Sequence, residues 1–176
     1  MANREALREL QARLAERLQA ARSEGVQAAW LAVEAAGARY LLPLAQAGEI
    51  FPTPAPQPVP YTQPWFLGVA NLRGGLWGVI DLASFISGRP PVPRPELQRA
   101  QTRVVALNAI LEVNCAILVD RLAGLRALDA FQSSSPAPAG SPGWFGSLYT
   151  DSSGACWQEI NLQALSQQPQ FLSISA

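Results

Sequence analysis

The chain has 176 residues, a formal net charge of zero and 49% hydrophobic side chains, and all thirteen of its cationic residues are arginines. Because histidine and lysine are both absent, the sequence excludes an imidazole general base, a phosphorylatable histidine and a histidine metal ligand, as well as the lysine of a P-loop, a Schiff base or a protein kinase. The length suits one domain or two small ones, and the basic excess typical of a nucleic-acid-binding protein is missing.

Residues 1–25 are predicted to form an amphipathic helix. Leucines recur there at steps of three and four, and Gly25 ends the pattern; the stripe consists of Leu7, Leu10, Leu14 and Leu18. The helix either packs on the domain that follows or binds a partner, and we expect the body to fold without it. Charged residues fill the first turn and no apolar run reaches about 18 residues, so we expect a soluble intracellular protein without a signal peptide or membrane span.

The first part of the body is predicted to contain strands. Segments 30–33 and 39–42 flank a small turn at 35–37, which indicates a hairpin, and a third short strand is expected to end at 49–51. Six prolines then fall within the thirteen residues 52–64. Such a tract can be a ligand for an aromatic groove, but inside a domain it favours an extended, ordered crossing.

The second part of the body repeats this pattern of short strands and turns. Strands are expected at 76–82, 104–107, 115–119, 149–150 and 156–160. A short helix is expected around 84–86 and a final helical turn within 163–168, while 133–143, made only of Ser, Pro, Ala and Gly, is predicted to be a flexible loop. Because long helical crossovers are missing, the pattern indicates a mainly β fold, a sandwich or barrels.

No motif in the sequence indicates catalysis or metal binding. The candidate carboxylates are isolated along the chain; they are Asp81, Asp120 and Asp129. We therefore predict no catalytic residue, no metal site and no cofactor. Cys115 and Cys156 are expected to be free thiols, since disulfides are rare inside cells.

One stretch of the sequence contains a motif that indicates a particular protein family. Residues 65–74 read Trp-Phe-Leu-Gly-Val-Ala-Asn-Leu-Arg-Gly and lead into an apolar strand, 76–82, that ends in Ile-Asp-Leu. This arrangement resembles the signature of the CheW-like coupling proteins of bacterial chemosensory systems. Further segments fit the same family in the same order, namely 40–51, 115–122 and 157–162. The residues of this stretch resemble most those of the family branch that serves type IV pilus twitching motility.

The resemblance implies a fold and a role. The fold would be two small five-stranded SH3-like β-barrels that share an apolar seam, within residues 26–170. Members of the family are non-enzymatic adaptors that bridge the cytoplasmic tip of a methyl-accepting chemoreceptor to the regulatory domain of a CheA-type histidine kinase. The protein would then be cytoplasmic and recruited to receptor arrays at the inner membrane, without inserting into the membrane or binding nucleic acid. Its zero net charge and sparse surface charge favour self-association.

The resemblance also implies a partner-binding surface. In the family, the residues that match Glu49 and Arg73 form an ion pair near the receptor-binding surface, and an arginine fork can fix a carboxylate in one geometry. The alternative is an ordinary surface pair that contributes about 0–1 kcal/mol. Gly74 or Gly75 is expected to supply a positive φ, and Asn71 to bond the loop backbone.

The full set of predicted partner-binding residues is Glu49, Asn71, Leu72, Arg73, Gly74, Val119, Asp120 and Leu122. The last three would line a groove between the barrels, although packing at a strand end explains them equally well.

Two rival functions remain open at this point. The same architecture could be a generic peptide- or nucleic-acid-binding module, which retention on heparin would reveal. An enzyme could instead assemble its site from scattered carboxylates, and loss of turnover on Asp81→Asn or Asp120→Asn would favour that function.

Overall fold

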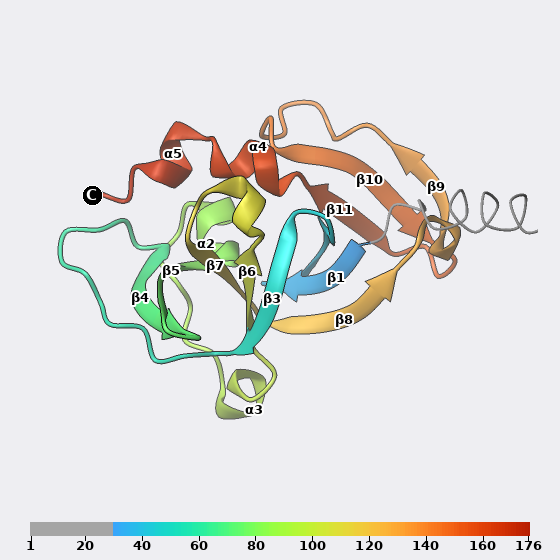
Figure 1. Ribbon diagram of the computed structural model, residues 1–176. Helices are drawn as coiled ribbons and strands as arrows, with labels where there is room; N and C mark the ends of the chain where they lie inside the picture. Colours follow the sequence, from blue (N-terminus) through green and yellow to red (C-terminus); the bar gives the residue numbers. More distant parts are fainter. Residues whose placement is uncertain (1–29) are drawn as a thin grey trace, which may run out of the picture.

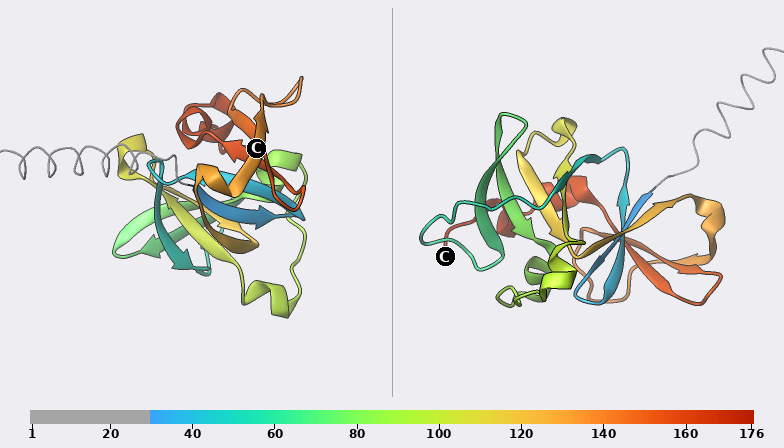
Figure 2. Two further views of the ribbon diagram at one scale, coloured as in Figure 1. Left: turned by 90° about the vertical axis from the view of Figure 1, so that its right-hand side faces the viewer. Right: turned by 90° about the horizontal axis from the view of Figure 1, so that it is seen from below.

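The computed structural model describes residues 30–176, so the helix expected over 1–25 lies outside the described residues. Two sheets lie side by side (Figures 1 and 2). The six-stranded sheet has the order β8-β1-β2-β11-β10-β9 and comprises β1 (Trp30–Ala35), β2 (Ala38–Pro43), β8 (Arg121–Arg126), β9 (Phe131–Ser135), β10 (Phe145–Asp151) and β11 (Cys156–Ile160). The five-stranded sheet has the order β3-β6-β7-β5-β4 and comprises β3 (Ala47–Pro52), β4 (Phe66–Leu72), β5 (Gly75–Asp81), β6 (Arg103–Leu107) and β7 (Cys115–Val119).

Short helices connect and cover the strands. They are α2 (Leu82–Ser87), α3 (Glu96–Arg99), α4 (Leu162–Ser166) and α5 (Pro169–Leu172), with single 3₁₀ turns η1 (Ala109–Leu111) and η2 (Leu128–Ala130). Two of the α-helices begin at a capping side chain: Asp81 accepts a hydrogen bond from the Ser84 amide at α2, and Asn161 accepts one from the Ala164 amide at α4.

The chain passes through the two sheets in three stages. It builds the hairpin β1–β2 in the six-stranded sheet, then all five strands of the other sheet, and returns with β8 to complete the first. The return takes place between β7 and β8, where Asp120 is the single residue that separates the two strands. Asp120 therefore lies where the two sheets are joined.

Alternating side chains divide the apolar interior into three clusters. In β7, Cys115, Ile117 and Val119 point into a large core shared by both sheets, whereas Ala116 and Leu118 point into a smaller core of the five-stranded sheet. A third cluster belongs to the six-stranded sheet and contains Trp30, Ala32, Leu41 and Trp157. Each sheet thus has an interior of its own, and the shared core is the apolar seam between them.

The structure confirms the mainly β fold with two sheets. The hairpin around 35–37, the crossing after β3 and the short helix after β5 all lie where the sequence predicts them, and β10 and β11 contain the strands expected at 149–150 and 156–160. Strands β4 and β8 form in addition, in segments for which the sequence analysis predicts only a motif.

The strand count of the first sheet corrects the expectation of five strands. The sixth strand is β9, and its last residues, Ser133–Ser135, fall within the predicted flexible loop 133–143. These serines are exposed, so their side chains carry no periodic apolar signal. Backbone pairing with β10, which joins Ser133 to Thr150 and Ser135 to Leu148, holds them in the sheet.

Candidate partner-binding site

A tight turn joins β4 to β5 and presents the predicted arginine. Arg73 and Gly74 both have positive φ, 50° and 82°, which is the geometry of a type I′ hairpin turn. The Asn71 side chain accepts a hydrogen bond of 2.8 Å from the Gly74 amide. The predictions for Gly74 and Asn71 are therefore confirmed, whereas Gly75 is paired with Leu72 in the ladder.

The expected ion pair between Glu49 and Arg73 is present. An Arg73 Nη2 to Glu49 Oε1 distance of 2.6 Å joins side chains that are 75% and 42% exposed. Glu49 lies on β3 and Arg73 follows β4, and these are the two edge strands of the five-stranded sheet. The pair therefore spans the open side of the sheet, where the sheet curls and its edges approach each other.

A hollow of about 390 Å³ lies beside this pair. Its wall includes apolar side chains from several strands, among them Phe51 and Trp77. Trp77 is half-buried in this wall. A charged pair beside a partly apolar hollow forms a surface suited to a protein partner.

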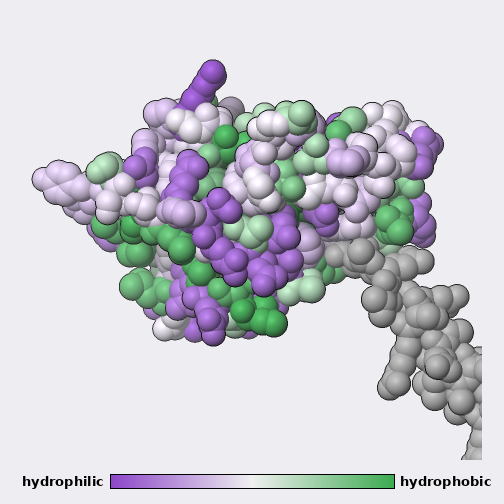
Figure 3. Space-filling view, turned by 90° about the horizontal axis from the view of Figure 1, so that it is seen from above, coloured by the Kyte–Doolittle hydropathy of each residue, from purple (hydrophilic) through white to green (hydrophobic). Residues whose placement is uncertain are grey.

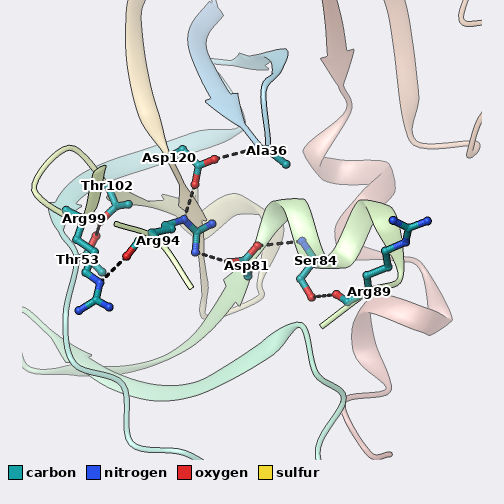
Figure 4. A network of polar contacts seen from close by, with 9 residues as sticks. All are labelled: Ala36, Thr53, Asp81, Ser84, Arg89, Arg94, Arg99, Thr102 and Asp120. Atoms are coloured by element: carbon teal, nitrogen blue, oxygen red, sulfur yellow. Dashed lines mark hydrogen bonds and ion pairs between the residues drawn. The ribbon is translucent and has the colours of Figure 1, made fainter. Parts of the chain in front are cut away.

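A second polar cluster joins the two sheets (Figure 4). The Arg94 Nη1 donates to Asp81 at 2.8 Å, and the Arg94 Nε donates to Asp120 at 2.5 Å. The other oxygen of Asp81 accepts from the Ser84 amide, and the other oxygen of Asp120 accepts from the Ala36 amide in the β1–β2 turn. Every carboxylate oxygen of the cluster is thus hydrogen-bonded.

Burial makes this cluster different from a surface ion pair. The side chains of Asp81, Arg94 and Asp120 are 1%, 15% and 11% exposed. Burial by itself acts to lower the pKa of Arg94, but hydrogen bonds and charge interactions with Asp81 and Asp120 outweigh burial and raise that pKa. The guanidinium therefore stays charged and fixes the proline-rich segment before α3 to both sheets.

The predicted site residues fall into two groups. Asn71, Arg73, Gly74 and Glu49 lie together on the surface at one end of the five-stranded sheet, and Leu72 anchors them from the core below. Val119, Asp120 and Leu122 lie at the junction between the sheets. Val119 is fully buried and Leu122 is half-buried against the shared core, so packing accounts for both.

Sequence reasoning missed Arg94. The aspartates that it treated as unrelated, Asp81 and Asp120, converge on Arg94. Nothing in the sequence distinguishes Arg94 from the other arginines, apart from its place between two prolines.

The described part of the chain was also searched for metal sites, membrane-spanning helices and cysteine thiols. Residues 30–176 contain no group of three or more side chains placed to hold a metal ion. Within the same residues, no helix has the length and apolar character needed to cross a bilayer. Cys115 is a buried free thiol whose pKa is raised by burial, and Cys156 is an exposed free thiol.

Comparison with known proteins agrees with the fold and the motif. The family model of the CheW-like domain matches residues 29–170. Protein PilI of Pseudomonas aeruginosa is 29% identical over 143 residues, which cover 79% of this chain and 75% of that protein. Among solved structures, the scaffolding protein TtCheW from Thermoanaerobacter tengcongensis superposes with a TM-score of 0.62 at 16% identity, over 77% of this chain and 89% of that one.

The fold and the match over residues 29–170 define the class: the chain belongs to the CheW-like domain family, the scaffold domains of chemotaxis-type signalling. Protein PilI is among its relatives. The resemblance in the Asn-Leu-Arg-Gly segment is thereby confirmed at the level of the family.

Proposed function

We propose that this protein is a non-enzymatic adaptor that couples methyl-accepting chemoreceptors to a CheA-type histidine kinase. Membership of the CheW-like family supports this role, and the similarity to Protein PilI favours a system that controls type IV pilus twitching motility. The adaptor would act in the cytoplasm, on receptor arrays at the inner membrane, and would need no cofactor.

The observation that carries the proposal is the surface around Glu49 and Arg73. The type I′ turn holds the Arg73 backbone in one conformation, and the ion pair links the two edge strands of the sheet, β3 and β4. The exposed pair contributes about 0–1 kcal/mol to folding, so stability alone does not account for a strained arginine at this position. A preformed charged group beside an apolar hollow is suited to specific recognition of another protein.

The proposal predicts that Arg73→Glu weakens binding of the receptor tip or of the kinase regulatory domain by tenfold or more. The substitution places two carboxylates side by side and removes the donor that a partner would contact. Isothermal titration calorimetry with each purified partner from the same genome measures the effect. A thermal melt of the variant should stay close to that of the unmodified protein, because both side chains are exposed.

Arg121→Glu is the matched control. Arg121 on β8 forms another exposed pair with Glu34, through two hydrogen bonds of 3.0 and 2.7 Å, although these side chains, at 53% and 24%, are less exposed than Arg73 and Glu49. This control should bind both partners normally. Normal binding of both partners by the Arg73→Glu variant would refute a role for this surface and leave the ion pair as a structural feature.

A further inference from the structure

Exposed apolar side chains lie on both sides of Trp30, the first residue of β1. Trp30 pairs with Pro43 at the end of β2 and with Arg126 at the end of β8. Leu44 follows Pro43 and is 38% exposed, and Leu125 precedes Arg126 and is 69% exposed. Because neighbouring strands are about 4.8 Å apart, β2 and β8 are separated here by only about 10 Å.

The 3₁₀ turn η1 extends this apolar surface. The Asn108 amide donates at 2.9 Å to the carbonyl of Gln46, which ends the turn that Leu44 begins, and Ile110 on η1 is 76% exposed. In the right-hand view of Figure 2, η1, the turn between β2 and β3 and the start of β1 follow one another along the upper edge. The same edge is the lower one in Figure 3, where dark green apolar side chains occur among polar ones. We call Leu44, Ile110 and Leu125 the apolar rim.

Residues 1–25 contain an apolar stripe of a size that fits this rim. The stripe is formed by Leu7, Leu10, Leu14 and Leu18, which recur at helical spacing, and a helix from the first to the last of them is about 16 Å long. Mostly charged or small residues lie between the leucines, so one side of the helix is apolar. Since most helical stability comes from packing of such a side, the stripe requires an apolar surface.

We propose that the leucine stripe of residues 7–18 docks on the apolar rim of the same chain. The covalent connection favours this occupant over any other. Eleven residues, 19–29, separate Leu18 from Trp30, and an extended chain of that length spans about 40 Å, so the whole rim is within reach. A short connection gives an effective concentration in the millimolar range. A second copy or another protein of equal affinity must exceed that concentration to displace the stripe.

Docking covers apolar surface on a chain that has few charges to keep molecules apart. Only 15% of the residues are charged, and the formal net charge is zero. An uncovered apolar rim would therefore be open to contact with other copies. The segment thus acts as an intramolecular cover for the rim, a role that does not depend on the proposed adaptor function.

Hydrogen–deuterium exchange of the full chain, followed by mass spectrometry, tests the docking. The amides of residues 7–18 should exchange at least tenfold more slowly than those of a free peptide of the same sequence. Combining Ile110→Ser with Leu125→Ser should remove this protection, and the fold should remain because both side chains are exposed. Leu97→Ser is the matched control, since Leu97 is an exposed leucine on α3, at the bottom of Figure 1, and should keep the protection.

A pair of introduced cysteines locates the stripe without weakening the rim. Cys156→Ser first removes the exposed thiol, whereas Cys115 is buried. In this background, Leu14→Cys with Ile110→Cys should form a disulfide within one chain in oxidised glutathione. The reaction should be at least tenfold faster than with Leu14→Cys and Leu97→Cys.

Three results would overturn the proposal. Exchange of residues 7–18 as fast as in the free peptide would show that the stripe is not docked and leave the rim open to another protein. Protection that survives the two serine substitutions, with equal disulfide rates for the two cysteine pairs, would place the stripe elsewhere. Disulfides between chains, with protection that rises with protein concentration, would assign the rim to a second copy.

Discussion

Arg94 is the residue on which the junction between the two sheets depends. Its Nε and Nη1 donors reach two different carboxylates, on Asp81 and Asp120, and Asp120 in turn accepts from the Ala36 amide of the other sheet. Only a guanidinium offers several donors in a fixed plane, so a lysine could not hold both aspartates in this way. With two carboxylates and one guanidinium, the cluster carries a formal charge of −1 when all three groups are ionised.

Replacing Arg94 by methionine should destabilise the fold by about 3–5 kcal/mol, because it leaves two buried carboxylates without their cation. Urea unfolding, monitored by tryptophan fluorescence, measures the change in the free energy of unfolding. Arg121→Met, which removes an exposed pair, should cost no more than about 1 kcal/mol. An Arg94→Met variant as stable as this control would contradict the structural role of the cluster.

For single residues, the sequence predicted the position and geometry of those that belong to a local motif. Asn71, Arg73 and Gly74 belong to one turn, so their geometry follows from neighbouring residues, and the family resemblance supplied Glu49 as the partner. Arg94 could not be found in this way. Its two aspartates are far from each other in the sequence, and only the parallel pairing of β5 with β7 brings the ends of those strands together.

The crossing between β3 and β4 approaches β4 closely at one glycine. Gly68 has a φ of 128°, and a Cβ atom placed on it would lie 2.1 Å from the carbonyl oxygen of Gln57. No side chain fits there unless the crossing moves away from β4. The glycine thus allows the close approach through which Gln57 and Val69 exchange their hydrogen bonds.

Gly68→Ala should therefore destabilise the protein by about 2–4 kcal/mol, since the strain of an unfavourable φ adds to that of a steric clash. The matched control is Gly124→Ala on β8, where φ is also positive, at 89°, but no atom lies within 4 Å of the added Cβ. The control should cost only about 1–2 kcal/mol. Equal losses for the two variants in urea unfolding would show that the crossing tolerates displacement.

The elements also show what periodicity can predict. Strands with alternating buried and exposed residues, or with continuous apolar runs such as 115–119, were found from sequence alone. β9 was not, because Phe131–Ser135 has mostly small, exposed side chains and becomes a strand through pairing with β10. The flexible loop predicted over 133–143 can therefore include only the residues after β9, and their flexibility remains a prediction.

For the whole molecule, the shared core determines how surfaces are placed. Both sheets contribute side chains to one apolar seam, and the Arg94 cluster adds a polar link beside it. The two sheets therefore form one body, and the Glu49–Arg73 surface lies at one end of the five-stranded sheet. The sequence predicted the two barrels and their seam through the family resemblance, but not the Arg94 cluster that links them.

An adaptor that bridges two partners must bind both of them at the same time. We would saturate the protein with the receptor-tip fragment and then titrate the CheA-type kinase regulatory domain by calorimetry. We expect a complex of all three components, with an affinity for the kinase domain within threefold of that measured without the receptor fragment. Competition between receptor fragment and kinase domain for the protein, or no binding of either, would contradict the claim.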